Sequence, residues 1–213
     1  MNAILPIRAG SQRVKNKNIF PINGKPLYTY IVQTLKKVDQ IDKIIINTDY
    51  NLIKESFIND PRVEVMERDK GLRGNCNINL VIQRVLEKYE GEFFLQTHTT
   101  NPLLSAETIS SAIDYFQKHK ESFDSLFSVT KVQKRFWTEK SVPINHSIDA
   151  EPTTQNLEPM YEENSCIYIF SQSSFYKGQN RIGAKPCVFS IPKIESVDID
   201  DVEDMKLVTR LMA

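Results

Sequence analysis

Residues 4–18 read ILPIRAGSQRVKNKN, and this stretch indicates both the fold and the site. The apolar run 3–7 predicts a buried strand. At Arg8 the sequence changes to a loop of cations and small polar residues. A loop that follows the first strand of an α/β sheet lies at the carboxyl edge, where such sheets bind ligands. Backbone N–H groups around Gly10 and Ser11, with cations beside them, suit a polyphosphate.

The spacing of this loop matches neither of the two common phosphate-binding motifs. It contains no GxxxxGK[ST] and no GxGxxG, so it predicts neither a P-loop nor a dinucleotide fingerprint. A solvated basic surface loop is the alternative, because many runs of Lys and Arg are only that. The position of the loop directly after the first strand favours phosphate binding.

The composition limits the class of protein. A chain of 213 residues fits one domain, and an apolar fraction of 40% with 11 Phe is enough for a core. The 27 Lys and Arg balance the 27 Asp and Glu, which argues against nucleic acid or an anionic membrane as a partner. The 3 cysteines have no CxxC spacing and indicate free thiols in a reducing compartment. With no signal peptide and no membrane-spanning apolar run, we expect a cytoplasmic protein.

Short apolar runs alternate with helical patterns over most of the chain. This alternation predicts an α/β fold with a doubly wound, mostly parallel sheet of Rossmann type. The expected strands are residues 3–7, 43–47, 63–66, 93–96, 125–130, 165–170 and 186–191. We expect a helix from residue 27 to 38 with Pro26 in its first turn, and a helix of about ten residues around Leu52. Ser105 is expected to cap a further helix.

Residues 131–163 interrupt this alternation. The segment contains Pro143, Pro152 and Pro159, many polar residues and Trp137, the only tryptophan. Such a stretch is either a long functional loop or an arm exchanged with a partner subunit. We therefore expect a single nucleotidyltransferase domain, residues 1–213, with residues 131–163 as an irregular arm.

Asp198 and Asp200 are a candidate metal site. They lie two residues apart in a segment expected to be extended, so both carboxylates would point the same way. Paired carboxylates suit Mg²⁺ when substrate phosphates and waters supply its other ligands. Alternatively, these residues begin a helix together with Asp201, Glu203 and Asp204, because acids are favourable near the positive end of a helix. The spacing alone leaves both interpretations open.

Polar side chains also follow two later strands. Gln96 and Thr97 end a buried strand and would face the ligand edge of the sheet, although loop capping explains them equally well. Arg68 and Asn75 lie in the loop after the third strand, where they could read a base or ribose, or be plain surface groups. His98 has no acidic or nucleophilic partner in the sequence, so we expect only a loop residue.

Together these loops indicate a nucleotidyltransferase. The basic loop would hold a triphosphate, the later loops a nucleoside and an acceptor, and the late acids Mg²⁺. Such a reaction needs no covalent intermediate. Charge neutralisation and the positioning of an attacking oxygen would supply the rate enhancement.

Two stretches resemble signatures of a known family. Residues 8–18 read RAGSQRVKNKN and residues 197–204 read VDIDDVED. They resemble the R-x-G-S-K-x-x-x-x-K-N and IDIDTPED motifs of the acylneuraminate cytidylyltransferases, the CMP-sialic acid synthetase family. Four stretches between them are similar to further motifs of that family. Residues 24–27 resemble its GKPL motif, residues 48–49 the end of its STD motif, residues 95–103 its LQPTSPL motif and residues 164–169 its NGAIYI motif.

The resemblance implies transfer of CMP from CTP to the anomeric hydroxyl of an acidic 2-keto sugar, with release of pyrophosphate and Mg²⁺ as the cofactor. The expected nucleotide-binding residues are Arg8, Gly10, Ser11, Gln12, Arg13, Lys17, Asn18, Arg68 and Asn75. Those expected to bind the keto sugar acid are Gln96, Thr97 and Gln155. Asp198 and Asp200 would hold the metal and, with Arg8 and Lys17, form the catalytic group. The resemblance also implies a homodimer, in which residues 131–163 are the dimerisation arm and close over the neighbouring subunit's site.

Three departures from the family pattern bear on the substrate. Gln12 replaces the usual Lys and removes one charge from the triphosphate loop. Residues 98–101 replace the P-T-S run of the acceptor loop, and residues 71–77 lack the acidic E-x-x-x-D pattern. The last two favour a keto sugar other than sialic acid. The alternatives are an enzyme that uses another nucleotide and a sugar phosphate, and a family member that binds nucleotide without turnover. The missing glycine fingerprint disfavours a dehydrogenase-like Rossmann domain.

Overall fold

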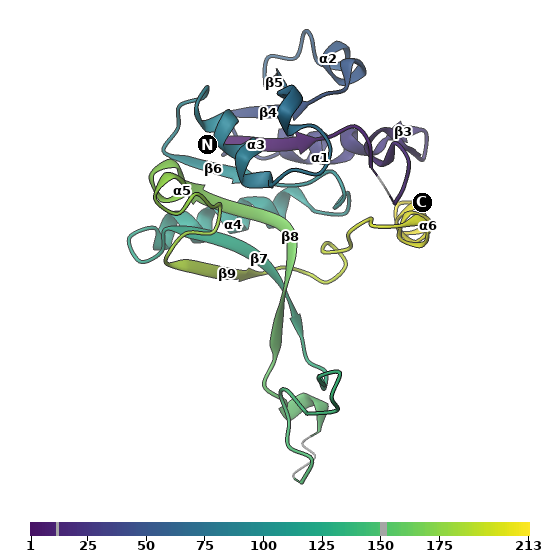
Figure 1. Ribbon diagram of the computed structural model, residues 1–213, viewed down its shortest axis with the longest axis vertical. Coiled ribbons are helices and arrows are strands. Elements are labelled where there is room, and N and C mark those ends of the chain that lie inside the picture. Colours follow the sequence, from purple (N-terminus) through teal and green to yellow (C-terminus); the bar gives the residue numbers. More distant parts are fainter. Residues whose placement is uncertain (12, 150–152) are drawn as a thin grey trace.

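A seven-stranded sheet runs through the body of the molecule (Figure 1). The computed structural model describes residues 1–11, 13–149 and 153–213. The strand order is β5-β4-β1-β6-β8-β7-β9. The strands are β1 (Asn2–Ile7), β4 (Lys43–Thr48), β5 (Val63–Glu67), β6 (Phe93–Gln96), β7 (Ser125–Val132), β8 (Met160–Ser171) and β9 (Pro186–Ser190).

The sheet is mostly parallel, as predicted. β1 pairs in parallel with β4 and β6, β4 with β5, and β7 with β9. β8 is antiparallel to both of its neighbours, β6 and β7. The reversal follows from the connection between β7 and β8, which returns the chain beside the strand it has just left without a crossover helix.

Helices cover both faces of the sheet (Figure 1). They are α1 (Leu27–Lys36), α2 (Asn51–Ser56), α3 (Ile78–Leu86), α4 (Ala106–His119), α5 (Gln172–Gly178) and α6 (Val202–Leu211). Short elements complete the fold: the 3₁₀ turns η1 (Lys17–Ile19), η2 (Lys70–Leu72) and η3 (Thr154–Asn156), and the strand pair β2 (Pro21–Ile22) and β3 (Lys25–Pro26).

Successive residues of β1 enter different cores. Leu5 packs in a cluster with Ile31 of α1 and Ile109 of α4. Ile4 packs in a second cluster with Ile82 of α3 and Phe175 of α5. Side chains alternate between the two faces of a strand, and both faces of this sheet are covered. This double burial explains why the strand sequences are continuous apolar runs.

The helix boundaries match most of the expected ones. Ser105 caps α4 as predicted, because its hydroxyl accepts the Thr108 N–H at 3.1 Å. Two details were wrong. Pro26 belongs to β3 and immediately precedes α1, and α2 has 6 residues where about ten were expected. Its apolar pattern is short, since Ile53 is its buried residue and Leu52 is exposed.

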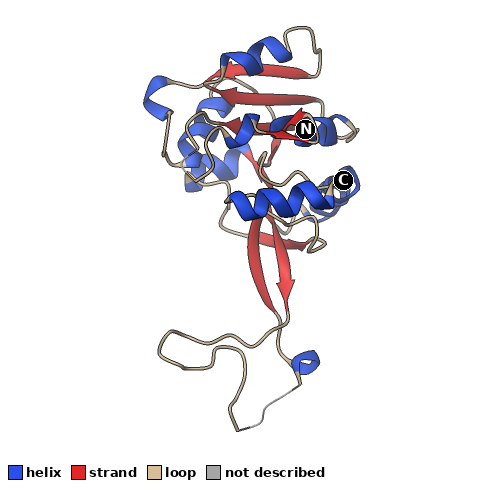
Figure 2. Ribbon diagram, turned by 90° about the vertical axis from the view of Figure 1, so that its right-hand side faces the viewer, coloured by secondary structure: helices blue, strands red, loops and turns tan. Residues whose placement is uncertain are grey.

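β7 and β8 continue beyond the body as a two-stranded ribbon that carries a protruding tip (Figures 1 and 2). The residues of β7 from Val129 to Val132 pair with those of β8 from Glu163 back to Met160. The expected arm, residues 131–163, therefore contains strand residues at both ends, and its described residues outside β7 and β8 are 133–149 and 153–159. No helix in the described residues is long and apolar enough to cross a membrane.

Candidate active site

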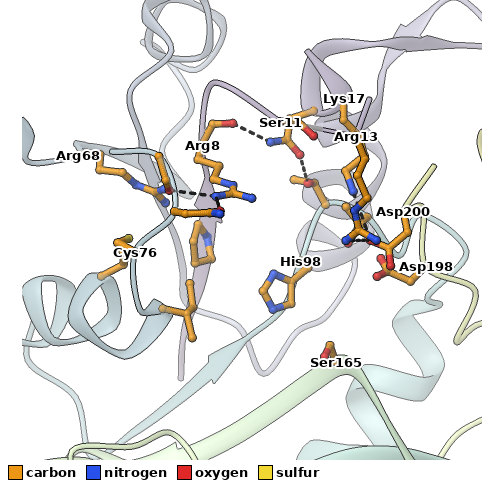
Figure 3. Close-up of a pocket in the computed structure, with 18 of the residues that line it drawn as sticks. Arg8, Ser11, Arg13, Lys17, Arg68, Cys76, His98, Ser165, Asp198 and Asp200 are labelled. Atoms are coloured by element: carbon orange, nitrogen blue, oxygen red, sulfur yellow. Dashed lines mark hydrogen bonds and ion pairs between the residues drawn. The ribbon is translucent and has the colours of Figure 1, made fainter. Parts of the chain in front are cut away.

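A cavity of about 510 Å³ opens at the carboxyl edge of the sheet (Figure 3). The loops after β1, β5 and β6 line it, together with the segment that precedes α6, part of β8 and the turn after α5. Nine predicted site residues line this cavity: Arg8, Ser11, Arg13, Lys17, Asn18, Arg68, Asn75, Asp198 and Asp200. The structure thus brings together residues from both ends of the chain.

The basic loop is held in place by hydrogen bonds at each end. Its Ala9 N–H donates to Asp49 Oδ1 at 2.6 Å. Asn18 is buried and donates through Nδ2 to the Arg8 carbonyl at 2.9 Å, while its Oδ1 accepts the Thr99 hydroxyl. Asn18 therefore ties the β1 loop to the β6 loop through both of its amide atoms, in addition to lining the cavity.

Gly10 supplies the turn of this loop. Its φ of +78° lies in the left-handed region that favours glycine. Gly10 is not among the residues that line the cavity, so the structure gives it a backbone role. Gln12, predicted to bind nucleotide, lies outside the described residues.

Arg8 joins the β1 loop to the loop after β5. Its Nη1 donates to the Gly74 carbonyl at 3.0 Å and to Asn75 Oδ1. These contacts place two predicted nucleotide-binding side chains against each other at one end of the cavity (Figure 3). Cys76 also lines this end, a residue that sequence reasoning did not select.

Arg68 is a buried cation, with 3% of its surface exposed. Its Nε donates to Asn47 Oδ1 at 2.8 Å and its Nη2 to the Asn47 carbonyl at 3.2 Å. Burial lowers the pKa of the guanidinium, and the charge of Asp49 acts in the opposite direction. Neutral groups thus accept these hydrogen bonds, and a positive charge lines the wall beside Cys76.

Asp198 and Asp200 lie beside two cations of the basic loop (Figure 3). Arg13 Nη2 is 2.7 Å and Lys17 Nζ is 3.9 Å from Asp200 Oδ1. Lys17 also donates to the Ile199 carbonyl. Burial lowers the pKa of Lys17, although Asp198 and Asp200 partly offset this. Two acids and two cations therefore share one end of the cavity.

Asp198 is the more buried of the two acids. Burial raises its pKa, a hydrogen bond from the Thr100 side chain acts in the opposite direction, and the negative charge of Asp200 adds to the rise. Asp198 Oδ1 is buried and has no hydrogen-bond partner among the described residues. Such an atom is costly unless a cation or donor reaches it.

The helix-start interpretation of the acidic run is confirmed for Asp201 and Asp204, whereas the metal site at Asp198 and Asp200 stays a prediction. Asp201 Oδ1 accepts the N–H groups of Glu203 and Asp204, and Asp204 accepts the Asp201 N–H in return, which caps α6. Asp198 and Asp200 lie before this cap and line the cavity.

The carboxylate pair fits Mg²⁺. Hard carboxylate oxygens suit this ion, and the unpartnered Asp198 Oδ1 offers a free ligand atom. The described residues contain no group of three or more His, Cys, Asp or Glu side chains that could hold a metal. A metal here would therefore need further ligands from substrate phosphates and water.

Gln96 and Thr97 were predicted to face the ligand edge of the sheet, but the structure buries both of them behind the cavity wall. Gln96 and Thr97 are completely buried and do not line the cavity, whereas the next residue, His98, does. Gln96 Nε2 donates to the Thr97 carbonyl at 2.8 Å and lies 3.0 Å from His98 Nε2. The expectation that His98 is only a loop residue was therefore incomplete. Gln155 lies in η3, in the arm, and not in the cavity of its own chain.

Arg181 is the main residue that sequence reasoning missed. It lies in the turn after α5 and lines the cavity. Its Nη1 donates to Gln96 Oε1, and its Cζ is 3.6 Å from the centre of the Tyr168 ring. Burial and the nearby Arg181 charge lower the pKa of His98 to about 3. A polar turn without a motif gave no signal for Arg181 before the fold was known.

A comparison with protein families decides the class. The family model described as cytidylyltransferase matches residues 2–204. The chain belongs to the cytidylyltransferase family. The resemblance predicted from the sequence motifs is thereby confirmed.

Curated members of the cytidylyltransferase family share about a quarter of the sequence. The N-acylneuraminate cytidylyltransferase of Streptococcus agalactiae serotype III is 24% identical over 210 residues, which cover 94% of this chain and 50% of that protein. The pseudaminic acid cytidylyltransferase of Campylobacter jejuni serotype O:2 is 23% identical over 216 residues, 95% of this chain and 92% of that protein. The chain spans about half the length of the streptococcal relative and nearly all of the other.

The fold is also that of a solved cytidylyltransferase. A CMP-2-keto-3-deoxy-manno-octonic acid synthetase, solved in complex with CTP, superposes with a TM-score of 0.70 at 13% identity, covering 99% of this chain and 97% of that one. At this identity the likeness concerns the fold. It confirms the predicted α/β fold with a mostly parallel sheet.

Proposed function

We propose that this cytidylyltransferase-family protein transfers CMP from CTP to the anomeric hydroxyl of an acidic 2-keto sugar. The acceptor oxygen would attack the α-phosphorus, and the bond from that phosphorus to the β-phosphate oxygen would break, releasing pyrophosphate. The observation that carries this proposal is the juxtaposition of Arg13 and Lys17 with Asp198 and Asp200 in one cavity. Polyphosphate binding needs cations, and metal binding needs the carboxylates.

The residues at each end of the cavity receive different roles in this proposal. Arg8, Ser11, Arg13 and Lys17 would hold the triphosphate, and the backbone at Gly10 would let the loop approach it. Arg68 and Asn75, beside Cys76, would face the nucleoside. Asn18 would act by keeping the β1 and β6 loops together.

Asp198 and Asp200 are proposed to hold Mg²⁺. When bound, the ion would supply positive charge to the phosphate oxygens. Asp200 is paired with Arg13 in the structure, so phosphates that attract Arg13 would release its carboxylate for the metal. The unpartnered Oδ1 of Asp198 would be a further ligand atom for the ion.

The acceptor is proposed to be a nonulosonic or related keto sugar acid. Two relatives carry N-acylneuraminate and pseudaminic acid in their names. His98 and Arg181 line this cavity. His98 belongs to residues 98–101, which depart from the family's sialate pattern. These differences favour an acid other than sialic acid.

The arm is proposed to form a homodimer. Its tip exposes apolar side chains that have no role in the body, including Trp137, Ile144 and Ile148. A second copy would bury them, and Gln155 would then reach the partner's cavity. We further propose a cytoplasmic location, which the free Cys76, Cys166 and Cys187 support.

The experiment measures pyrophosphate release with CTP, Mg²⁺ and a panel of sialic, pseudaminic, legionaminic and octulosonic acids. UTP and GTP, each with a sugar phosphate, test the rival nucleotidyltransferase. Release with CTP and one acid, absent in Asp200→Ala, is expected. CTP binding with no release for any acceptor would favour a nucleotide-binding protein without turnover, the alternative that Gln12 motivates.

A further inference from the structure

Arg181 lies in the cavity wall among neutral partners. Its Nη1 donates to Gln96 Oε1 and is 3.4 Å from His98 Nε2. Its guanidinium stacks on Tyr168, with Cζ 3.6 Å from the ring centre. Arg181 thus contacts an amide, an imidazole and a phenol.

None of these partners neutralises the guanidinium charge. The low pKa of His98 keeps its ring neutral, and burial raises the pKa of the Tyr168 hydroxyl to about 12. Glu163 accepts the Tyr168 hydroxyl, and its negative charge raises the pKa of Arg181. Among the described residues, no carboxylate lies within the 4.0 Å ion-pair distance of Arg181. Burial lowers the pKa of Arg181, and Tyr168 and the more distant Glu163 only partly offset this. A desolvated cation that lacks an ion-paired carboxylate favours binding of an anion.

The turn that carries Arg181 is held rigidly. The Arg181 N–H donates to Asn79 Oδ1 at 3.3 Å, and the Gly183 N–H donates to Ser125 Oγ at 2.8 Å. The N–H groups of Ala184 and Lys185 both donate to the Asp124 carboxylate, at 2.9 and 3.0 Å. The guanidinium is therefore positioned before any ligand arrives, which reduces the cost of binding.

Gly183 is required by this packing. A Cβ at this position would lie 2.3 Å from both Asp124 Oδ1 and Ser174 Oγ. Any larger residue must displace either the turn two residues after Arg181 or the Asp124 and Ser174 side chains, and Asp124 is the carboxylate that holds this turn. The sequence of the turn is thus restricted by the same contacts that fix the cation.

Arg181 also occupies a separate part of the cavity from the basic loop. Its contacts are with the end of β6 and with β8, whereas Arg8, Arg13 and Lys17 follow β1. The sheet order puts β6 between β1 and β8, so the two sets of cations approach from different sides. A second anionic group, distinct from the triphosphate, would satisfy Arg181.

We propose that Arg181 binds the carboxylate of the acceptor sugar acid and thereby determines the acceptor class, with Gln96 and His98 orienting the guanidinium. This inference rests on the proposed function. The planar fork of Arg matches a carboxylate in a bidentate arrangement, which a Lys ammonium cannot reproduce. The acceptor would then be held by its acid group beside the reacting centre.

The experiment compares the acid that the wild type uses with its C1 amide, in wild type, Arg181→Gln, Arg181→Lys and the exposed control Arg210→Gln. The amide keeps the shape and removes the charge. We expect Arg181→Gln to lower kcat/KM for the acid on the order of 100-fold, mainly through KM, and to leave that for the amide unchanged. For Arg181→Lys, we expect a kcat/KM for the acid between those of the wild type and Arg181→Gln. The dissociation constant of CTP is expected to be the same in all four proteins.

Gly183→Ala tests positioning while the charge remains. It is expected to raise the acceptor KM, whereas Gly178→Ala, where a Cβ meets no atom within 4 Å, is expected to have no effect. Thermal unfolding of each variant identifies a loss caused by misfolding. A folded Gly183→Ala protein with wild-type acceptor KM would contradict the rigid positioning of Arg181.

Two results would overturn the proposal. One is an unchanged preference for acid over amide in Arg181→Gln, and the other is an equal loss of CTP affinity, which would place Arg181 in the nucleotide site. If the wild type turns over no acid, the proposed function fails and calorimetric titration of the acids into the CTP-bound protein decides this inference. Acid binding by the wild type that is lost in Arg181→Gln supports it, and equal binding, or no binding by either protein, overturns it.

Discussion

Arg13 and Asp200 form an ion pair across the cavity, with Nη2 of one 2.7 Å from Oδ1 of the other. Their side chains are 67% and 45% exposed, so water screens the pair. Exposed ion pairs contribute about 0–1 kcal/mol to stability, so this pair adds little to the stability of the fold. In the proposed function, one member of the pair binds phosphate and the other binds metal, so each would neutralise the charge of the other until substrate arrives.

Replacing Asp200 should separate activity from stability. We expect Asp200→Asn to lower pyrophosphate release by at least about 100-fold, a loss of about 3 kcal/mol in transition-state stabilisation, because one of two metal ligands is weakened. The same change should shift the melting temperature by no more than about 3 °C, since the ion pair is exposed. Parallel rate and thermal-unfolding measurements check both statements.

Glu203→Gln is the matched control for Asp200→Asn. Glu203 is an exposed acid in the same run and pairs with Lys206 at 2.7 Å outside the cavity. It should leave both the rate and the melting temperature close to those of the wild type. Equal losses of activity in the two variants would show that the net charge of this segment matters and not the ligand.

Asp198 should make metal-free stability depend on pH. Because burial raises its pKa above the ordinary 3.8, the folded state keeps a proton that the unfolded state releases. Wild-type stability therefore falls as the pH rises from 3.8 through the raised pKa. We expect Asp198→Asn to be more stable than the wild type at pH 7, by about 1 kcal/mol, and inactive.

The difference between Asp198→Asn and wild type should shrink as the pH is lowered and disappear below 3.8. Urea unfolding without metal, repeated across this range, measures it. A variant that is less stable than the wild type at pH 7 would contradict the raised pKa of the Asp198 carboxyl. Adding CTP and Mg²⁺ should stabilise only the wild type.

Asn18 and Thr99 should behave as one unit. Asn18→Ala leaves the Arg8 carbonyl and the Thr99 hydroxyl without their partner, and we expect a loss of about 2 kcal/mol. Thr99→Val removes only one of these bonds. A double-mutant cycle on the free energy of unfolding should give a coupling of about 1 kcal/mol. Additive effects would mean that the two loops are not joined through this bond.

Most of the fold could be predicted because its signals are local. The apolar runs of β1, β4 and β6 are buried on both faces of the sheet, and the Ser105 cap acts on the next turn of chain. The direction of β8 was not predictable in the same way. It depends on how residues 133–159 return the chain, and this loop carries no periodic pattern.

The candidate site could be predicted where residues follow strands. Arg8, Arg68 and Asp200 are near chain features that a sequence shows, namely strand ends and a helix start. Arg181 reaches the cavity through Asn79, Ser125 and Asp124, which lie far from it in the sequence. Such contacts exist only after folding. For the same reason, the sequence suggested that Gln96 faces the ligand, whereas in the structure Gln96 is buried and accepts a hydrogen bond from Arg181.

The arm provides the last prediction, which concerns assembly. Ile148 is 61% exposed at the arm's tip, and Ile58 is 80% exposed in the body near α2. If a second copy covers the arm, Ile148→Asp places a charge in that interface and should shift the protein toward the monomer by at least about tenfold in dissociation constant. Ile58→Asp introduces the same charge on a free surface and should leave the mass unchanged. Sedimentation equilibrium distinguishes these outcomes, and a wild type that is monomeric at all concentrations would disprove the dimer. If the partner's arm also completes the cavity, Ile148→Asp should lose turnover in parallel with the dimer, and activity should return as the protein concentration is raised.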